Sequence, residues 1–265
     1  MSGGFSDGSI EARVAALKKG AIAPALRRSL DIYYGDPKRD AAMDRLYAKF
    51  VKPGALAFDI GSHVGDRVGA FLRLGARVVA AEPQPECAQL VSSIYGGHAG
   101  FTLLEVAVGA ETGRLQLHVN GANPTISTAS TPFIDAARDA PQWRGETWDR
   151  AIEVPVTTLD ALIATHGSPA FIKIDVEGWE AQALAGLSKP PPALSFEFTT
   201  IQRDVAERCL ARLEMLGRYR YNVALGESQR FTFAEYISGA EMATHIAALP
   251  LSANSGDVYA VLDPS

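Results

Sequence analysis

The chain lacks the features that mark disulfide-rich, membrane-spanning and nucleic-acid-binding proteins. It has only two cysteines, Cys87 and Cys209, each in a segment that is predicted to be helical, so buried free thiols are expected rather than disulfides. No apolar run approaches the roughly 20 residues that a membrane span needs, and the N-terminus does not resemble a signal peptide. The net charge of −5 offers no basic surface for nucleic acid. These absences predict a cytoplasmic protein without membrane or nucleic-acid partners, and leave open whether it is a homo-oligomer.

The composition is otherwise that of an ordinary globular protein, with 47% hydrophobic and 21% charged residues. Two segments stand out from it. Ala55-Leu-Ala-Phe-Asp-Ile-Gly-Ser-His-Val-Gly65 is an apolar run with an acid and two glycines at its end, and Val78-Val-Ala-Ala-Glu-Pro83 is a second apolar run that ends in an acid. A strand, a glycine turn, a helix and a second strand tipped with a carboxylate form the βαβ unit that binds a ribosyl cofactor.

The glycine spacing indicates which cofactor this unit binds. A dinucleotide fingerprint requires G-x-G-x-x-G, whose backbone N–H groups bind a pyrophosphate. This chain instead has Asp59-x-Gly61-x-x-x-Gly65, with a carboxylate that would repel phosphate and attract a cation. S-adenosylmethionine carries a sulfonium, an ammonium and a ribose but no phosphate. The pattern therefore favours a methyl donor over NAD, and an NAD-dependent oxidoreductase is the less favoured alternative.

Predicted strands and helices alternate along the chain, which is typical of an α/β protein whose parallel sheet is covered on both faces. The predicted helices are 9–30, 38–50, 65–74, 84–95, 158–166, 177–187 and 202–216. The predicted strands are 55–60, 77–82, 101–108, 114–120, 152–156, 171–177, 193–199, 219–225 and 257–262. Residues 121–150 interrupt this rhythm with a long irregular segment, which is usually a functional lid or a disordered loop.

Four motifs follow one another along the chain: Phe58-Asp-Ile-Gly-Ser-His-Val-Gly65, Glu82-Pro83, Val156-Thr-Thr-Leu-Asp160 and Ile172-Lys-Ile-Asp-Val-Glu-Gly178. Taken together, they resemble the FkbM family of class I S-adenosylmethionine-dependent methyltransferases. The resemblance covers roughly residues 50 to 200, although the family more often has Ala-Asn in place of Ser62-His63. It implies a Rossmann-like fold with a seven-stranded, mostly parallel sheet flanked by helices, whose last strand is antiparallel.

The resemblance also implies O-methylation of a hydroxyl on a small molecule such as a sugar, a glycan or a polyketide-type natural product. A methyltransferase that acts on nitrogen, protein or RNA would share the cofactor half and remains an alternative. We expect a single domain over residues 1–265. Its parts are N-terminal helices in 1–50, the cofactor half in 51–120, an inserted lid in 121–150 and the rest of the sheet in 151–265.

The cofactor contacts are expected from the first three strands and the loops that follow them. Glu82 would accept hydrogen bonds from both ribose hydroxyls, and Gly65 would open a helix whose free N–H groups take the methionine carboxylate. The full set of predicted cofactor residues is Asp59, Gly61, Ser62, His63, Gly65, Glu82, Pro83, Glu105, Val106, Ala107 and Asp175. Of these, Glu105, Val106 and Ala107 lie at the end of the third strand, where class I enzymes contact adenine.

Methyl transfer to a hydroxyl benefits from a general base, and the predicted candidates are Asp175, Glu197 and His63, in that order. Lys173, Asp175 and Glu177 alternate along one predicted strand, so their side chains should point the same way. Lys173 would then orient the carboxylate, and a purely structural ion pair is the competing interpretation. A metal is not expected, because no tight ligand spacing is present.

Overall fold

The computed structural model describes residues 7–263 of the 265-residue chain, with side chains from residue 10 onward. Residues 1–6, which belong to the N-terminal segment predicted not to be a signal peptide, lie outside the described part. The chain begins with three helices, α1 (Asp7–Lys19), α2 (Pro24–Tyr33) and α3 (Pro37–Tyr47). The single helix predicted over 9–30 is wrong, because proline disfavours a helical residue before it and Pro24 therefore starts a new helix. The helix predicted over 38–50 is α3, whose N-cap residue Asp36 accepts the N–H of Lys38 at 2.9 Å.

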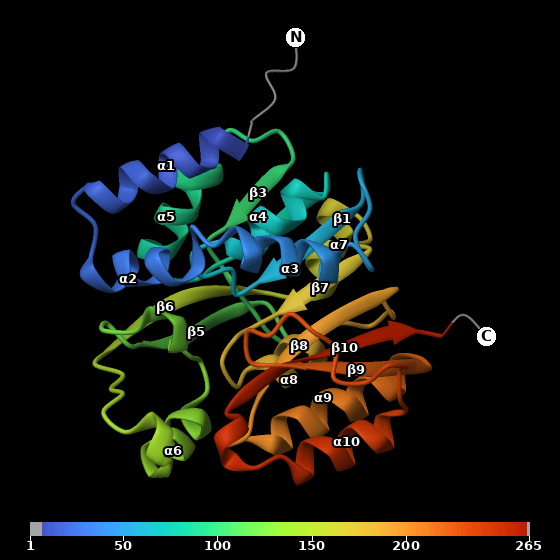
Figure 1. The fold of residues 1–265 in the computed structure, drawn as a ribbon. Coiled ribbons are helices and arrows are strands. Elements are labelled where there is room, and N and C mark those ends of the chain that lie inside the picture. The colour runs from blue at the N-terminus through green and yellow to red at the C-terminus, as the bar shows by residue number, and fades with distance from the viewer. Residues whose placement is uncertain (1–6, 264–265) are drawn as a thin grey trace.

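The main sheet has seven strands in the order β3-β2-β1-β7-β8-β10-β9 (Figure 1). Its strands are β1 (Leu56–Ile60), β2 (Arg77–Ala81), β3 (Phe101–Leu104), β7 (Phe171–Ile174), β8 (Ala193–Thr199), β9 (Tyr219–Leu225) and β10 (Ser255–Leu262). Strands β3, β2, β1, β7 and β8 pair in parallel, whereas β10 is antiparallel to both of its neighbours. The predicted seven-stranded, mostly parallel sheet with an antiparallel last strand is confirmed.

Helices cover both faces of this sheet, and alternate residues of the strands point to the two layers. Phe58 on β1 packs with the layer of α7 (Leu159–His166), α8 (Glu180–Ala185), α9 (Arg203–Leu216) and α10 (Gly239–Ala248). Ala57, its neighbour, packs with the layer of α1, α2, α3, α4 (Asp66–Arg73) and α5 (Pro85–Tyr95). Cys87 in α5 and Cys209 in α9 are free and buried, as predicted. Within residues 7–263, no helix combines the length and the apolar character that crossing a membrane requires.

A second, three-stranded sheet has the order β4-β6-β5 and consists of β4 (Ala107–Val108), β5 (Gly113–Val119) and β6 (Arg150–Thr157). The single strand predicted over 101–108 is therefore wrong. Its first half pairs with β2 in the main sheet, and its last two residues pair with β6. The break at Glu105 and Val106 redirects the chain just beyond the carboxyl end of β2.

The inserted segment 121–150 connects β5 to β6. The prediction that this segment is irregular is wrong. It contains a 3₁₀ turn (Pro124–Ile126), helix α6 (Thr131–Asp139) and a second 3₁₀ turn (Pro141–Trp143). The segment has its own small core of Ile126, Phe133, Ala137, Ala140 and Trp143. Apolar side chains that pack on one another hold this segment in a defined shape beside the main sheet.

Candidate active site

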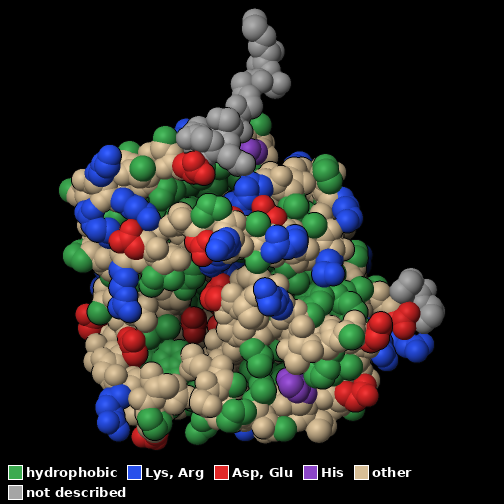
Figure 2. Space-filling model, in the orientation of Figure 1, with side chains coloured by type: hydrophobic (Ala, Val, Ile, Leu, Met, Phe, Trp, Pro, Cys, Tyr) green, Lys and Arg blue, Asp and Glu red, His purple; other side chains and the backbone are tan. Residues whose placement is uncertain are grey.

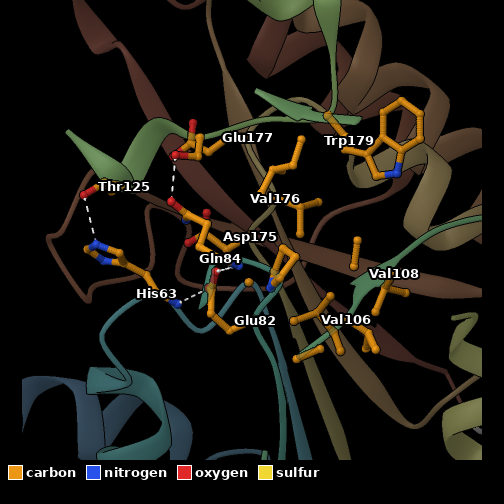
Figure 3. Close-up of a pocket in the computed structure, with 18 residues that line it drawn as sticks. His63, Glu82, Gln84, Val106, Val108, Thr125, Asp175, Val176, Glu177 and Trp179 are labelled. Atoms are coloured by element: carbon orange, nitrogen blue, oxygen red, sulfur yellow. Dashed lines mark hydrogen bonds between the residues drawn. The ribbon is translucent and has the colours of Figure 1, made fainter. Parts of the chain in front are cut away.

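A first cavity lies across the carboxyl ends of β1, β2 and β7, the edge at which open α/β sheets bind ligands (Figure 3). Glu82, directly after β2, is 2% exposed and faces this cavity. One carboxylate oxygen accepts the N–H of His63 at 2.7 Å and the other accepts the N–H of Gln84 at 2.9 Å. Burial raises the pKa of Glu82 to about 7, although both hydrogen bonds oppose this rise. The two backbone groups fix the carboxylate and leave a lone pair on each oxygen for a ligand.

The glycine turn after β1 is possible only because two positions lack a side chain. Gly61 has φ +82°, and a Cβ atom there would lie 1.8 Å from the carbonyl oxygen of Asp175. Gly65 has φ +83°, and a Cβ atom there would lie 2.8 Å from the ring of Tyr95. Gly61 lines the first cavity, whereas Gly65 lines neither this cavity nor the two neighbouring cavities that follow. The N–H of Gly65 donates to the carbonyl of Ser62 at 2.7 Å.

The apolar wall of the first cavity is formed by the segment that connects the two sheets. Pro83, Val106 and Ala107 line it, whereas Glu105 is exposed and does not. Additional lining residues that the sequence did not single out are Gln84, Val108, Leu117, Thr125, Ser127 and Trp179. These residues come from the start of α5, from β4, from β5, from the insertion and from the loop after β7, so only the folded chain brings them together.

A second cavity opens beside the first, and two of its lining residues have a buried polar atom without a partner among the described residues. Asp59 on β1 is 2% exposed, and its Oδ2 atom has no hydrogen-bond partner within the described chain. The buried hydroxyl of Ser62 in the same cavity is also unpaired. Burial, reinforced by the charge of Asp66, raises the pKa of Asp59 to about 7. These two atoms belong to residues that line the cavity, and most of the other lining side chains are polar or charged as well.

His63 lies between the two cavities and joins three segments of the chain. Its Nε2 atom is 3.3 Å from the hydroxyl of Ser29 on α2 and 3.5 Å from that of Thr125 in the insertion. Its ring packs edge-on against Tyr33, with ring centroids 5.6 Å apart. Burial lowers the pKa of His63 to about 4, so its imidazole is neutral near pH 7.

Lys173, at the centre of the sheet, is 1% exposed and binds two carboxylates. Its Nζ atom is 2.8 Å from Asp175 Oδ2 and 2.7 Å from Asp257 Oδ1 on β10. Lys173 reaches across β8, where the residue opposite it is the small Ser195. Although burial by itself would raise the pKa of Asp175, the charge of Lys173 lowers it below its usual value. Asp175 is therefore ionised near neutral pH.

Asp175, Glu177 and Glu197 form an acidic cluster in which one carboxylate oxygen of each lies within 4.8 Å of the others. Strand β7 ends at Ile174, and Glu177 has φ +52°, so the prediction that Lys173, Asp175 and Glu177 alternate along one strand is wrong. Glu177 reaches the cluster through a turn instead. Burial and the neighbouring carboxylates raise the pKa of both Glu177 and Glu197 well above its usual value. The spacing also suits a hard cation with oxygen ligands.

A third cavity of about 200 Å³ adjoins the second and contains this acidic cluster. In the view of Figure 2, acidic side chains are visible inside a hollow between the N-terminal helices and the lower half of the molecule. The lining includes Tyr33, Arg67, Thr125, Ile126, Trp143, Asp175, Glu177, Glu197, Thr199, Gly226, Glu227, Asn254, Ser255, Gly256 and Asp257. Thr125 and Asp175 line all three cavities. The cavities thus meet at one point, between the end of β7 and the insertion.

The sheet order and this edge site are those of a Rossmann-like α/β fold. The chain belongs to the FkbM methyltransferase family, because its residues 59–236 match the Methyltransferase FkbM domain. It is accordingly a methyltransferase that depends on S-adenosylmethionine. The described residues fit this cofactor: Glu82 has lone pairs for a ribose, Val106 and Val108 offer an apolar wall, and Asp59 offers an unpaired carboxylate oxygen.

One curated protein and several solved structures are also similar to this chain, at low sequence identity. Ribosomal RNA small subunit methyltransferase A of Sphingopyxis alaskensis is 29% identical over 154 residues, which cover 52% of this chain and 55% of that protein. The chain thus spans about half the length of this curated relative. Among solved structures, the O-methyltransferase from Bacillus cereus in complex with SAH is 13% identical, with 98% of this chain and 92% of that one covered and a TM-score of 0.48. Precorrin-6y C5,15-methyltransferase from Geobacter metallireducens is 13% identical, with 92% and 94% covered and a TM-score of 0.46.

Proposed function

We propose that this chain transfers a methyl group to a hydroxyl of a small molecule held in the third cavity. The observation that carries this proposal is the position of Asp175. This ionised carboxylate lines the first and second cavities, which we propose hold the cofactor, and also the third cavity. A hydroxyl is a weak nucleophile until its proton leaves, and a carboxylate at this junction can accept that proton. An amine acceptor would have less need of such a base.

Bound S-adenosylmethionine supplies an electrophilic methyl group on its sulfonium. The residues of the chain contribute position and proton transfer. Asp175 accepts the proton of the acceptor hydroxyl as the new bond from oxygen to the methyl carbon forms and the bond from that carbon to sulfur breaks. Lys173 holds the carboxylate in place through its 2.8 Å ion pair and offsets charge in the cavity. Burial and the neighbouring carboxylates raise the pKa of Glu197, and in its protonated form this residue would donate a hydrogen bond to another oxygen of the acceptor.

The lining of the third cavity favours a hydrophilic acceptor. Most of its residues carry carboxylate, hydroxyl or amide groups, and its largest apolar ring belongs to Trp143. Carboxylates and amides are typical partners of hydroxyl groups, and an aromatic ring can pack on the apolar face of a sugar. We infer that a sugar or glycan suits this cavity better than an apolar polyketide does.

Insertion segment 121–150 is proposed as the lid of this cavity. Its residues Thr125, Ile126 and Trp143 line the third cavity, and Thr125 and Ser127 line the first. Two hydrogen bonds tie it to Gln84 beside the cofactor edge: Gln84 Nε2 donates to the carbonyl of Pro124 at 3.1 Å, and Ser127 Oγ donates to Gln84 Oε1 at 2.8 Å. The segment thus covers the point at which donor and acceptor meet.

A screen with methyl-labelled S-adenosylmethionine tests the proposal. Purified full-length protein would be incubated with sugars, glycans, other hydroxylated metabolites, amines and ribosomal RNA, and the labelled product examined by NMR. We expect an O–CH₃ group on a small hydroxylated acceptor. Methylation of RNA is the second candidate, favoured by the name of the relative from Sphingopyxis alaskensis, and label found in RNA or on nitrogen would contradict our proposal.

Adding a chelator to the same assay distinguishes a mechanism in which a carboxylate is the base from one that requires a metal ion. Because Lys173 neutralises Asp175 within the acidic cluster, we expect EDTA to leave the rate unchanged. A loss of activity that Mg²⁺ restores would instead make Asp175, Glu177 and Glu197 metal ligands.

A further inference from the structure

An open groove of about 670 Å³ runs between helix α3 and the loop that follows β9, outside the three cavities described above. In the view of Figure 2, Lys and Arg side chains gather over the position of α3, above the hollow that contains acidic side chains. We call this the basic groove, because three cations and no acidic residue of the described chain line it. Its lining residues are Pro37, Lys38, Ala41, Ala42, Arg45, Ser228 and Arg230.

Each cation of the basic groove is available to a ligand. Lys38, Arg45 and Arg230 are exposed, and none of these side chains has a hydrogen-bond or ion-pair partner among residues 7–263. The chain as a whole has a net charge of −5, so this groove departs from the balance of the molecule. Cations of one sign that line a groove raise the local concentration of anionic ligands.

Helix α3 separates its cations from its acids. Lys38 and Arg45 are seven residues apart, which places them on the same helix face, and the two alanines between them leave the groove open. Asp40 and Asp44 instead lie beside Arg73, at 3.7 and 2.8 Å from its Nη2 atom. The acids of the helix are thus paired outside the groove and do not neutralise it.

The spacing of the cations indicates the size of the anion. Because an α-helix rises about 1.5 Å per residue, Lys38 and Arg45 start about 10 Å apart along the axis. A carboxylate or a single phosphate presents its charge at one point, whereas two linked phosphates distribute it along this length. The planar guanidinium of an arginine also pairs two phosphate oxygens at once. The basic groove therefore suits a diphosphate.

The basic groove adjoins the third cavity along the loop after β9. Glu227 lines the third cavity, and the next residue, Ser228, lines the groove. Glu227 Oε2 also accepts a hydrogen bond from Nη2 of Arg39 at 2.9 Å, and Arg39 directly follows Lys38. An elongated molecule can thus extend from the third cavity into the groove across this ion pair.

We propose that the basic groove binds a diphosphate that is part of the methyl acceptor. This inference rests on the function proposed above, in which the third cavity holds a hydroxyl of a sugar, and it specifies the substrate class as a sugar carried on a diphosphate. A nucleoside or a lipid at the other end of the diphosphate would share this chemistry. The cations of the groove contribute affinity, and proton transfer remains with Asp175.

Calorimetry with inorganic pyrophosphate tests the groove without any methyl transfer. The variant Arg45→Gln/Arg230→Gln removes two of its three charges. Arg77→Gln/Lys189→Gln is the matched control, because Arg77 and Lys189 are exposed, have no partner within the described chain and line neither the groove nor the three cavities. We expect pyrophosphate to bind about tenfold or more weakly to the groove variant and to change less than about twofold in the control. Equal affinities of the two variants, or no binding to the unmodified protein, would overturn the assignment.

Methyl transfer then tests the link to the acceptor. The sugar that the screen identifies would be compared in three forms: free, linked to uridine diphosphate, and linked to the diphosphate of a short prenyl alcohol. We expect a KM at least about tenfold lower for one of the diphosphate forms, and that form identifies the carrier. Equal KM values would overturn the link and leave the proposed function intact. Label found only in RNA would overturn both, whereas pyrophosphate binding decides the groove in either case.

Discussion

The ammonium of Lys173 lies 2.8 Å from Oδ2 of Asp175 and holds this carboxylate where the three cavities meet. The two residues differ in exposure, because the side chain of Lys173 is 1% exposed and that of Asp175 is 30% exposed. The pair thus has a buried cation that is fixed by the sheet and an anion that reaches the ligand. This arrangement suits a carboxylate that must stay ionised and oriented while it accepts a proton.

Removing the buried cation should destabilise the fold. Lys173→Met leaves Asp175 and Asp257 without their shared partner, and breaking a buried ion pair in this way costs about 3–5 kcal/mol. Urea denaturation measures this loss. Arg138→Met is the control, because Arg138 and Asp135 form an exposed pair that should contribute less than about 1 kcal/mol. Equal effects of the two substitutions would contradict a structural role for Lys173.

Lys173 should also set the pH dependence of methyl transfer. Its charge lowers the pKa of Asp175, so a variant that folds without it should lose activity at a higher pH than the unmodified protein does as the solution is acidified. Lys173→Arg retains the charge and should shift this acidic limb less than Lys173→Met. Identical pH–rate profiles for all three proteins would show that Lys173 does not act on the base.

Glu82 should contribute strongly to cofactor affinity. Glu82→Ala removes the acceptor of two ribose hydroxyls, each bond to a charged group contributing about 1.5–3 kcal/mol, so the dissociation constant for S-adenosylhomocysteine should rise at least about tenfold. Glu86→Ala is the control, since Glu86 lies four residues further on, is largely exposed and lines none of the three cavities. Calorimetry that finds the same affinity for both variants would disprove the ribose assignment.

The raised pKa of Glu82 gives a pH dependence of stability with a definite sign. In the folded chain burial raises this pKa to about 7 from an ordinary 4.5, so between these values the folded state binds more protons than the unfolded state. The free energy of unfolding should therefore fall as pH rises through this range. His63 acts in the opposite direction between about 4 and 6.5, so the comparison must isolate Glu82.

Glu82→Gln provides that comparison because glutamine does not titrate. One pKa unit corresponds to about 1.4 kcal/mol, so the stability of the unmodified protein relative to this variant should fall by about 3 kcal/mol between pH 4.5 and 7. Denaturation without cofactor at several pH values measures the difference. A difference that is constant with pH would mean that Glu82 is already ionised throughout.

The two tryptophans of the insertion should have separate roles. Trp143 lines the third cavity and its Nε1 has no partner in the described chain, whereas Trp148 Nε1 donates to the carbonyl of Ile126 at 2.8 Å. Trp143→Phe should raise the KM for the acceptor by about tenfold, with little change in cofactor affinity. Trp148→Phe should lower stability by about 1 kcal/mol and leave KM unchanged. A higher KM only in Trp148→Phe would contradict the lid as we propose it.

Short sequence motifs were enough to predict strands β1 and β2 and the glycine turn between them. The apolar runs that form β1 and β2 each end in an acid, and glycine turns leave few alternatives for the chain between them. Gly20 and Pro24 would also have predicted the break between α1 and α2. The division of residues 101–108 between two sheets had no comparable local signal, because it depends on pairing with β6, which follows some 40 residues later.

The third cavity was least accessible to sequence reasoning. Arg67 and Glu227 are 160 residues apart, yet they form an ion pair on its wall. Tyr33 comes from α2, and Trp143 comes from an insertion that seemed irregular because its core is small and separate from the main one. Side chains contributed singly by distant segments carry no periodicity or spacing that a sequence motif can reveal.

The most direct test of the account is Asp175→Asn, measured in a single turnover with the acceptor that the screen identifies. Asparagine retains the shape of the side chain and can still accept hydrogen bonds, but it cannot take up the hydroxyl proton. We expect the rate of methyl transfer to fall by about 10²-fold or more, while the dissociation constant for S-adenosylhomocysteine changes less than about threefold. An unchanged rate, or a loss of cofactor affinity that accounts for the whole decrease, would show that Asp175 is not the base.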